Sequence, residues 1–214
     1  MIDQWKFIKN PRFSARVELA EMISGILLVL FMWGHLMMLS TILFGEGTMN
    51  SLAEFLEEYY ISQVGVVGIA LLILLHFVAA GRKLPSRVKE QMVFWRLARK
   101  LRHMDTWLWL VQVITGMLML IFAAIHLFVI MTTFPIEAAK SAQRVAEAYG
   151  WLYAPMVLLV ELHLGVGLYR IIVKWTGINR RVATALKWVI TIAFVAVGYA
   201  ILRAFWLNGL DYLK

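Results

Sequence analysis

Apolar residues in this chain are concentrated in five blocks of roughly 20 residues, at 20–44, 63–81, 107–131, 151–173 and 184–207. At about 1.5 Å per residue, a helix of that length crosses a hydrocarbon layer about 30 Å thick. Helices are favoured because a lipid-exposed backbone must satisfy its own hydrogen bonds. The sequence therefore predicts an all-α integral membrane protein, a five-transmembrane-helix bundle in which residues 1–214 form a single transmembrane domain.

Basic residues are distributed unevenly between the connections. Eight lie between Arg82 and Arg102, five between Arg170 and Lys187, and four in the first 16 residues, whereas the 45–62 connection has none. Cytoplasmic loops carry the excess of Lys and Arg, so we expect a cytoplasmic N-terminus and a C-terminus on the opposite, periplasmic side. The net charge of +8 is explained by this topology and does not indicate nucleic-acid binding.

The chain contains no cysteine. Disulfides, iron–sulfur clusters held by thiolates and covalently attached c-type haem are therefore excluded within it. It also has no Gly-rich phosphate-binding loop and no large extramembrane domain for a nucleotide or flavin. Any electrons that the protein handles must pass to another chain.

Four of the five histidines lie inside the predicted spans, each on a different helix: His35, His76, His126 and His163. A single such histidine often makes only an interhelical hydrogen bond, but ionisable residues at membrane depth are rare. With the predicted topology, counting along each helix places His35 and His126 in the outer half of the membrane. His76 and His163 fall in the inner half.

Two histidine pairs stacked across a membrane suit two bis-histidine haems, because each porphyrin iron takes one axial imidazole from either side. Zinc or copper fits less well, since thiolates are absent and two histidines per level leave a tetrahedral site incomplete. We therefore predict two b haems with His35, His76, His126 and His163 as the iron ligands.

The first and third spans share an internal similarity. "SGILLVLFMWGHL" and "TGMLMLIFAAIHL" align without gaps and place Gly25 and Gly116 ten residues before their histidines, at the depth of the inner pair. Two interpretations stay open: the missing side chains make room for a macrocycle, or they allow ordinary close helix packing. Gly165 and Gly167 beside His163 admit the same two interpretations.

Several stretches, "HLMMLSTIL", "LRHMDTWLWLVQ", "HLFVIMT" and "VELHLGVGLYRIIVKW", together resemble the dihaem cytochrome b subunit of quinol:fumarate reductases and of menaquinone-linked succinate dehydrogenases. The resemblance covers essentially the whole chain and implies five transmembrane helices in a bacterial cytoplasmic (inner) membrane. It assigns His76 and His163 to the haem near the cytoplasm and His35 and His126 to the distal haem.

The resemblance also implies positions near the haem propionates. His103 falls at a non-ligand histidine of the family, and Trp109 and Lys174 fall at propionate contacts. Trp109 can instead be an interfacial aromatic residue, and Lys174 can simply follow the positive-inside pattern.

Two glutamates are candidates for proton transfer. Glu161 lies two residues before His163, so the two side chains project in different directions. Glu161 either bonds to a neighbouring helix or acts as a proton relay, the role that the family proposes at this position. The resemblance places Glu57 at the glutamate that is proposed to meet the quinol substrate in some family members. Acidic loop residues are, however, commonly just solvated.

The resemblance implies a membrane anchor that oxidises menaquinol and passes electrons through two haems to an iron–sulfur subunit. A flavoprotein subunit beyond it would reduce fumarate, or oxidise succinate in the reverse direction, and a dimer of such heterotrimers is expected. The alternatives are the cytochrome b subunit of a formate dehydrogenase or hydrogenase, and a metal-ion transporter whose histidines bind the ion in passage.

Overall fold

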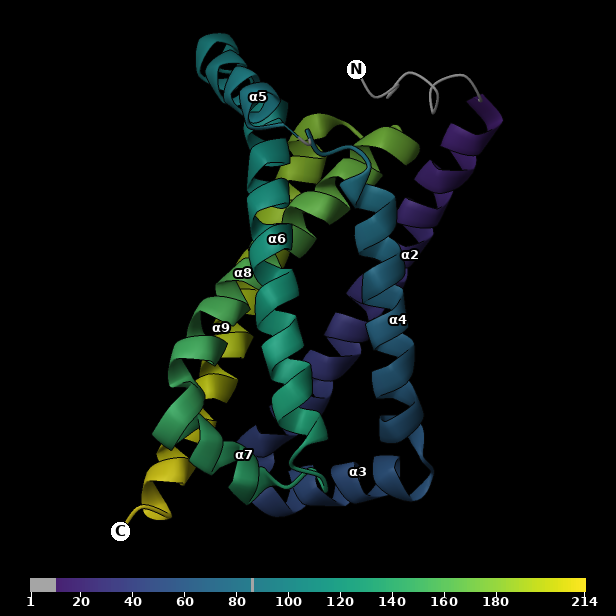
Figure 1. Ribbon diagram of the computed structural model, residues 1–214. Coiled ribbons are helices and arrows are strands. Elements are labelled where there is room, and N and C mark those ends of the chain that lie inside the picture. The colour runs from purple at the N-terminus through teal and green to yellow at the C-terminus, as the bar shows by residue number, and fades with distance from the viewer. Residues whose placement is uncertain (1–10, 86) are drawn as a thin grey trace.

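The computed structural model describes residues 11–85 and 87–214 (Figure 1). Five long helices stand side by side in it: α2 (Pro11–Ser40), α4 (Ile61–Gly81), α6 (Met104–Met131), α8 (Gly150–Trp175) and α9 (Arg180–Asp211). Each is long and apolar enough to cross a membrane, and the described residues form no β-strand. The prediction of an all-helical protein with five spans is therefore confirmed.

The helices extend beyond the apolar blocks at their polar ends. Helix α9 begins at Arg180, where the side chain of Asn179 accepts a hydrogen bond of 2.8 Å from the backbone N–H of Arg181 and caps the helix. Helix α2 is described from Pro11, the first residue that the structure describes. At α9, local capping rather than hydrophobicity sets the helix start.

Short helices close the two ends of the bundle. The amphipathic helix α5 (Val88–Leu101) follows α4 and precedes α6 in the chain, and it stands beyond the start of α6 at one end, which we call the basic end. At the other, the acidic end, lie the 3₁₀ turn η1 (Thr41–Phe44), α3 (Glu46–Glu58), α7 (Ala138–Arg144) and the π-helical turn η2 (Val145–Tyr149). Helix α2 begins at the basic end and the chain terminates at the acidic end, as an odd number of spans requires.

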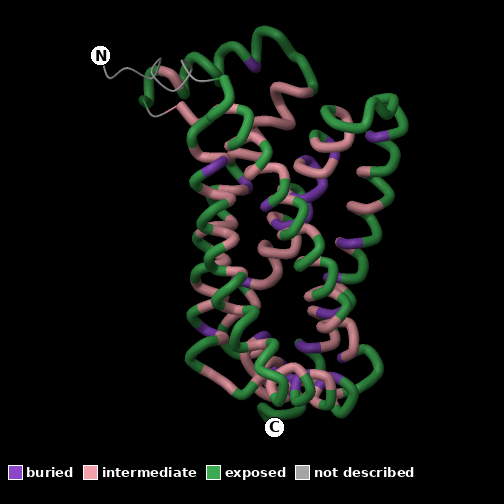
Figure 2. Tube along the Cα trace, turned by 90° about the vertical axis from the view of Figure 1, so that its right-hand side faces the viewer, coloured by how far each residue is buried: buried purple, intermediate pink, exposed green. Residues whose placement is uncertain are grey.

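Helix α8 is the centre of the packing. It contacts α6 and α9 most extensively, while α2 packs mainly against α4 and also contacts α8 and α9. Most residues on the outside of the bundle are exposed, and buried residues are few and face inward (Figure 2). Exposed Leu, Ile and Val side chains on a helix exterior are expected of a protein surrounded by lipid.

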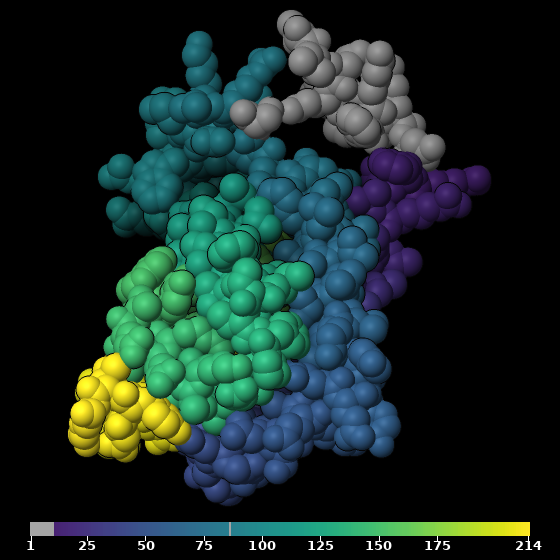
Figure 3. All heavy atoms as spheres, turned by 60° about the horizontal axis from the view of Figure 1, so that its bottom comes forward, coloured from purple at the N-terminus to yellow at the C-terminus, as the bar shows by residue number. Residues whose placement is uncertain are grey.

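The acidic end has its own small core. Met49 of α3, Ala138 and Ala142 of α7, and Phe205 of α9 are all buried in one apolar cluster. Seen from this end, α3 and the segment that leads from α6 to α8 cover the bundle, and the C-terminus lies to one side (Figure 3). This cover fixes the position of the loops that border the site described next.

Candidate functional site

The structure brings the four intramembrane histidines together in two pairs. The rings of His35 on α2 and His126 on α6 have centroids 6.2 Å apart with an angle of 68° between their planes. The rings of His76 on α4 and His163 on α8 have centroids 6.5 Å apart at 88°. These are the pairs that depth along the helices predicts. We call the first the acidic-end pair and the second the basic-end pair.

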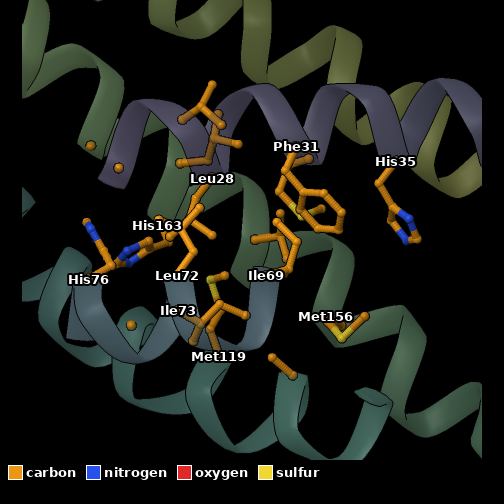
Figure 4. A pocket seen from close by; sticks show the side chains of 18 of the residues that line it. Leu28, Phe31, His35, Ile69, Leu72, Ile73, His76, Met119, Met156 and His163 are labelled. Atoms are coloured by element: carbon orange, nitrogen blue, oxygen red, sulfur yellow. The ribbon is translucent and has the colours of Figure 1, made fainter. Parts of the chain in front are cut away.

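All four histidines border one cavity of about 1390 Å³ between the α2–α4 pair and the other helices. In Figure 4, His76 and His163 lie next to each other at one end, and His35 reaches into the other. Between them the wall is apolar, with Phe31, Ile69 and Met119 among its side chains. The volume exceeds the roughly 300–1,000 Å³ of common small-molecule pockets. The cavity can therefore hold more than one such ligand.

The spacing of each pair fits a haem iron. A metal-bound imidazole nitrogen lies about 2 Å from the metal, and the ring centre lies about 1 Å further, so two axial imidazoles have centroids about 6 Å apart. The observed separations of 6.2 and 6.5 Å match this value. The donor set also suits haem, because neutral imidazoles in an apolar wall bind iron without adding net charge.

The glycines of the internal similarity lie against the basic-end pair. A Cβ atom on Gly25 would lie 3.2 Å from Cε1 of His76, and one on Gly116 would lie 2.9 Å from Cε1 of His163. Both glycines therefore give space to an imidazole ring. The sequence left two interpretations open, room for a macrocycle or close helix packing. The contacts favour close packing, in which each glycine packs against a histidine ring of the site and not against the backbone of another helix.

Gly165 and Gly167 also serve close contacts between helices. A Cβ on Gly165 would lie 2.8 Å from Oε1 of Glu161, and one on Gly167 would lie 2.8 Å from the amide nitrogen of Gln112. Side chains at these positions would displace polar groups that lie between α8 and its neighbours. Gly167 also borders the cavity.

Glu161 and His163 face different neighbours. Oε1 of Glu161 accepts a hydrogen bond of 2.6 Å from the hydroxyl of Thr191 on α9, whereas Nδ1 of His163 lies 3.0 Å from the backbone oxygen of Gln112 on α6. The Glu161 side chain is 1% exposed, and its Oε2 atom has no hydrogen-bond partner. Glu161 therefore lies in a polar contact between α8 and α9, outside the cavity wall.

The three predicted propionate positions lie at the basic end. Lys174 borders the cavity, and its Nζ lies 2.8 Å from a carboxylate oxygen of Glu18. Trp109 also borders the cavity and packs against Phe94 of α5, with ring centroids 5.2 Å apart. His103 precedes α6 as its N-cap residue, is exposed and is not part of the cavity wall.

Glu57 lies near the acidic end but does not border the cavity. Its Oε1 atom accepts a hydrogen bond of 2.7 Å from the backbone N–H of Ile136, which itself lines the cavity. The carboxylate thus holds the loop after α6 against α3. Its neighbour Leu56 is the residue of that turn that borders the cavity.

Arg144 and Tyr153, which the sequence analysis did not select, border the cavity beside the acidic-end pair. The ring of Tyr153 meets the ring of His126 edge to face at 5.7 Å. Arg144 donates from Nη2 to Ser141, 3.3 Å away, but its buried Nη1 atom has no partner. An unpaired guanidinium nitrogen in an apolar wall favours an anion in the cavity.

A break in helix geometry explains why both residues reach the cavity. Nine residues apart in a regular α-helix, Arg144 and Tyr153 would project on opposite sides. The π-helical turn Val145–Tyr149 between them rotates the chain less per residue, so both line the same wall. The one sequence signal for this site was an arginine in the 132–150 connection, whose only other basic residue is Lys140.

These features define a class: a five-span helical membrane protein with paired intramembrane histidines at two levels of one cavity. Among residues 11–85 and 87–214, no group of three or more His, Asp or Glu side chains could hold a metal ion. The family model described as succinate dehydrogenase/fumarate reductase transmembrane subunit matches residues 90–201. The chain belongs to this family.

Curated relatives agree with that family. A fumarate reductase cytochrome b subunit from Helicobacter pylori (strain ATCC 700392 / 26695) is 31% identical over 219 residues, which cover 96% of this chain and 86% of the relative. The fumarate reductase cytochrome b subunit of Wolinella succinogenes is 34% identical over 177 residues, covering 78% of this chain and 69% of the relative. The similarity thus extends to the spans before residue 90.

Proposed function

We propose that this chain is the membrane anchor of a quinol:fumarate reductase, or of a succinate dehydrogenase that runs the reaction in reverse. In this role the single domain oxidises menaquinol and delivers its electrons to an iron–sulfur subunit. Three observations support the proposal: the family of the chain, the printed names of its relatives and the two histidine pairs in one cavity. The two pairs carry most weight because they belong to the chain itself.

His35 and His126 would hold one b haem, and His76 and His163 would hold the other. When bound, the two haems supply the one-electron redox chemistry that connects the quinol site to the partner subunits. The protein contributes the axial nitrogens, an apolar wall that excludes water and charged groups at both ends for the propionates. Arg144 would bind a propionate at the acidic end. At the basic end Lys174 and Trp109 would do so, and exposed His103 would lie near that group.

Menaquinol would be oxidised near the acidic-end pair. We assign Glu57 to the proton acceptor role because its carboxylate accepts a hydrogen bond from the backbone of Ile136, a residue that lines the cavity. Glu161 would relay protons between α8 and α9, since it is buried, bonded to Thr191 and has one oxygen free to take a further partner.

The partner surface would be the basic end, which carries the exposed helix α5 with Arg99 and Lys100 in its last turn. We propose that the iron–sulfur subunit binds there, with the flavoprotein subunit beyond it, and that two such heterotrimers form a dimer. This arrangement requires the basic end to face the bacterial cytoplasm, as the positive-inside rule predicts.

The absorption spectrum of the purified protein tests the proposal most directly. Dithionite-reduced protein should show a b-type spectrum with two haems per chain. Replacing His35 with Ala should remove one of the two and leave the other, because the two pairs share no residue. Colourless wild-type protein would contradict the proposal.

Replacing His103 with Ala is the comparison for a histidine that is no iron ligand. Both histidine pairs stay intact in this variant, so both haems should be retained although His103 would lie near a propionate. Loss of a haem in this variant, with retention in His35→Ala, would overturn the assignment of the ligands.

A further inference from the structure

The two basic-end histidines make equivalent contacts with the helices opposite them. The hydroxyl oxygen of Ser24 on α2 lies 2.9 Å from Nδ1 of His76, and that of Thr115 on α6 lies 3.3 Å from Nδ1 of His163. Ser24 and Thr115 occupy the same position of the internal similarity, directly before Gly25 and Gly116. The internal similarity between α2 and α6 thus marks two equivalent sites, each of which contacts one histidine ring.

The direction of each hydrogen bond follows from the other partners of the hydroxyl. A hydroxyl carries one proton. Ser24 donates its proton to the backbone oxygen of Ala20 at 2.7 Å, and Thr115 donates to that of Val111 at 2.7 Å. Each hydroxyl oxygen can therefore only accept from the histidine, so Nδ1 of each ring carries the proton.

The backbone leads to the same result for His163. The carbonyl oxygen of Gln112 lies 3.0 Å from Nδ1 of this ring, and a carbonyl oxygen cannot donate. With the proton on Nδ1, the lone pair of Nε2 is free, and this is the form of imidazole that binds a metal. The chain thus selects the ligating tautomer of both rings.

The glycines restrict where each ring can lie. A Cβ on Gly116 would approach the His163 ring to 2.9 Å, and one on Gly25 would approach the His76 ring to 3.2 Å. Each ring therefore packs directly against the backbone of a glycine. The hydroxyl holds one edge of the ring while the glycine supports its Cε1 side. His126 of the acidic-end pair differs, because its buried Nδ1 has no hydrogen-bond partner.

We propose that Ser24–Gly25 and Thr115–Gly116 are two positioning units that fix the tautomer and orientation of the basic-end ligands and thereby lower the midpoint potential of that haem. The proposal rests on the proposed function, which makes these histidines haem ligands. A hydrogen bond accepted from Nδ1–H makes an imidazole more basic, and a more basic ligand stabilises the oxidised iron.

A redox titration of the purified complex tests this proposal. Ser24→Ala removes the hydroxyl acceptor of His76, and Thr115→Val removes one of the two acceptors of His163, each with little change in shape. The midpoint potential of the basic-end haem should therefore shift to a more positive value, and more so in Ser24→Ala. The potential of the other haem should stay in place. The His35→Ala variant, which retains the basic-end pair, shows which of the two potentials belongs to which haem.

Ser24→Thr and Thr115→Ser are matched controls that keep the hydroxyl, and both should titrate like the wild type. If the alanine variant does not accumulate, Ser24→Cys places a weaker acceptor at the same point and should give a smaller shift of the same sign. Unchanged potentials in all acceptor variants, or a shift confined to the acidic-end haem, would overturn the proposal.

Ring orientation gives a second, independent measurement. Gly116→Ala should force the His163 ring to move, since the added Cβ would lie 2.9 Å from Cε1. The electron paramagnetic resonance of the oxidised haem depends on the angle between its two imidazole planes, so the signal of the basic-end haem should change. If the wild type binds two haems and neither the acceptor variants nor Gly116→Ala change the potential or the signal, the positioning role is rejected. The proposed function would be unaffected by that result.

Discussion

Unpaired polar atoms reveal which residues of this protein need a ligand. Buried polar atoms in an apolar medium nearly always have a hydrogen-bond partner, because leaving one unpaired costs about 1–3 kcal/mol. Within the described residues, Nδ1 of His126 and Nη1 of Arg144 are buried and unpaired, and both residues border the cavity beside the acidic-end pair. A ligand with an anionic group would satisfy the guanidinium and offset its burial.

Replacing Arg144 with Leu should weaken binding of the haem proposed for the acidic-end pair and spare the haem proposed for the basic-end pair. A hydrogen bond to a charged group contributes about 1.5–3 kcal/mol, which corresponds to roughly a tenfold to hundredfold lower affinity. Haem content per chain after purification, measured by the reduced spectrum, gives the outcome. Arg144→Lys keeps the positive charge and should therefore lose less haem than Arg144→Leu.

Lys140→Leu is the matched control for Arg144. Both cations lie on α7, but Lys140 pairs with Glu137 at 2.7 Å, its side chain is 39% exposed and it does not border the cavity. Removing an exposed ion pair changes stability little. Equal haem loss in the Lys140 and Arg144 variants would show that α7 acts through its fold and not through the guanidinium.

At the scale of the elements, the sequence could predict only those helices that are marked by a long apolar block. The five spans were identified because apolar blocks of membrane length have one stable form in lipid. The short helices α3, α5 and α7 were not, because amphipathic segments between spans have no comparable signal and depend on what they pack against. The π-helical turn that brings Arg144 to the cavity was equally hidden, since no residue type specifies it.

Gly209→Ala should loosen the attachment of α7 to α9. A Cβ at Gly209 would contact the backbone oxygen of Ala142 and lie 2.7 Å from Cβ of Ala146, so the two elements would have to separate. Overpacking of this kind costs about 1–3 kcal/mol. Because α7 carries Arg144, the acidic-end haem should be released at a lower temperature than in the wild type, which a thermal ramp followed by absorbance measures.

Gly47→Ala provides the comparison for this glycine. Gly47 lies within α3, and a Cβ there would meet no atom within 4 Å. Alanine favours a helix over glycine by about 1 kcal/mol, so this variant should be as stable as the wild type or slightly more so. A lower release temperature for Gly47→Ala than for Gly209→Ala would contradict the packing argument.

On the scale of the whole molecule, the cavity runs from the basic end of the bundle to the acidic end. Residues such as Lys83 and Lys174 border it at the basic end, and Leu56 and Ile136 border it at the acidic end. Spacing along each helix was enough to predict which histidines share a level. Contacts between distant segments were not predictable, and the bond from Glu57 to the backbone of Ile136 is the clearest example.

Charge asymmetry predicts that the basic end faces the cytoplasm. The natural chain has no cysteine, so one introduced thiol can report the side on which it lies. Glu54 on α3 and Gln91 on α5 are both exposed and lie at opposite ends. In intact cells with a permeable outer membrane, a maleimide that cannot cross the inner membrane should label Glu54→Cys and leave Gln91→Cys unlabelled.

Breaking the membrane should make Gln91→Cys reactive, which shows that the thiol was shielded by sidedness and not by folding. The reverse pattern would place the basic end outside, and the positive-inside argument would then be wrong for this chain. It would also move the proposed partner surface on α5 away from the cytoplasm. The labelling pattern thus decides which side of the membrane each histidine pair and the proposed partner surface lie nearer to, because one pair lies toward each end of the bundle.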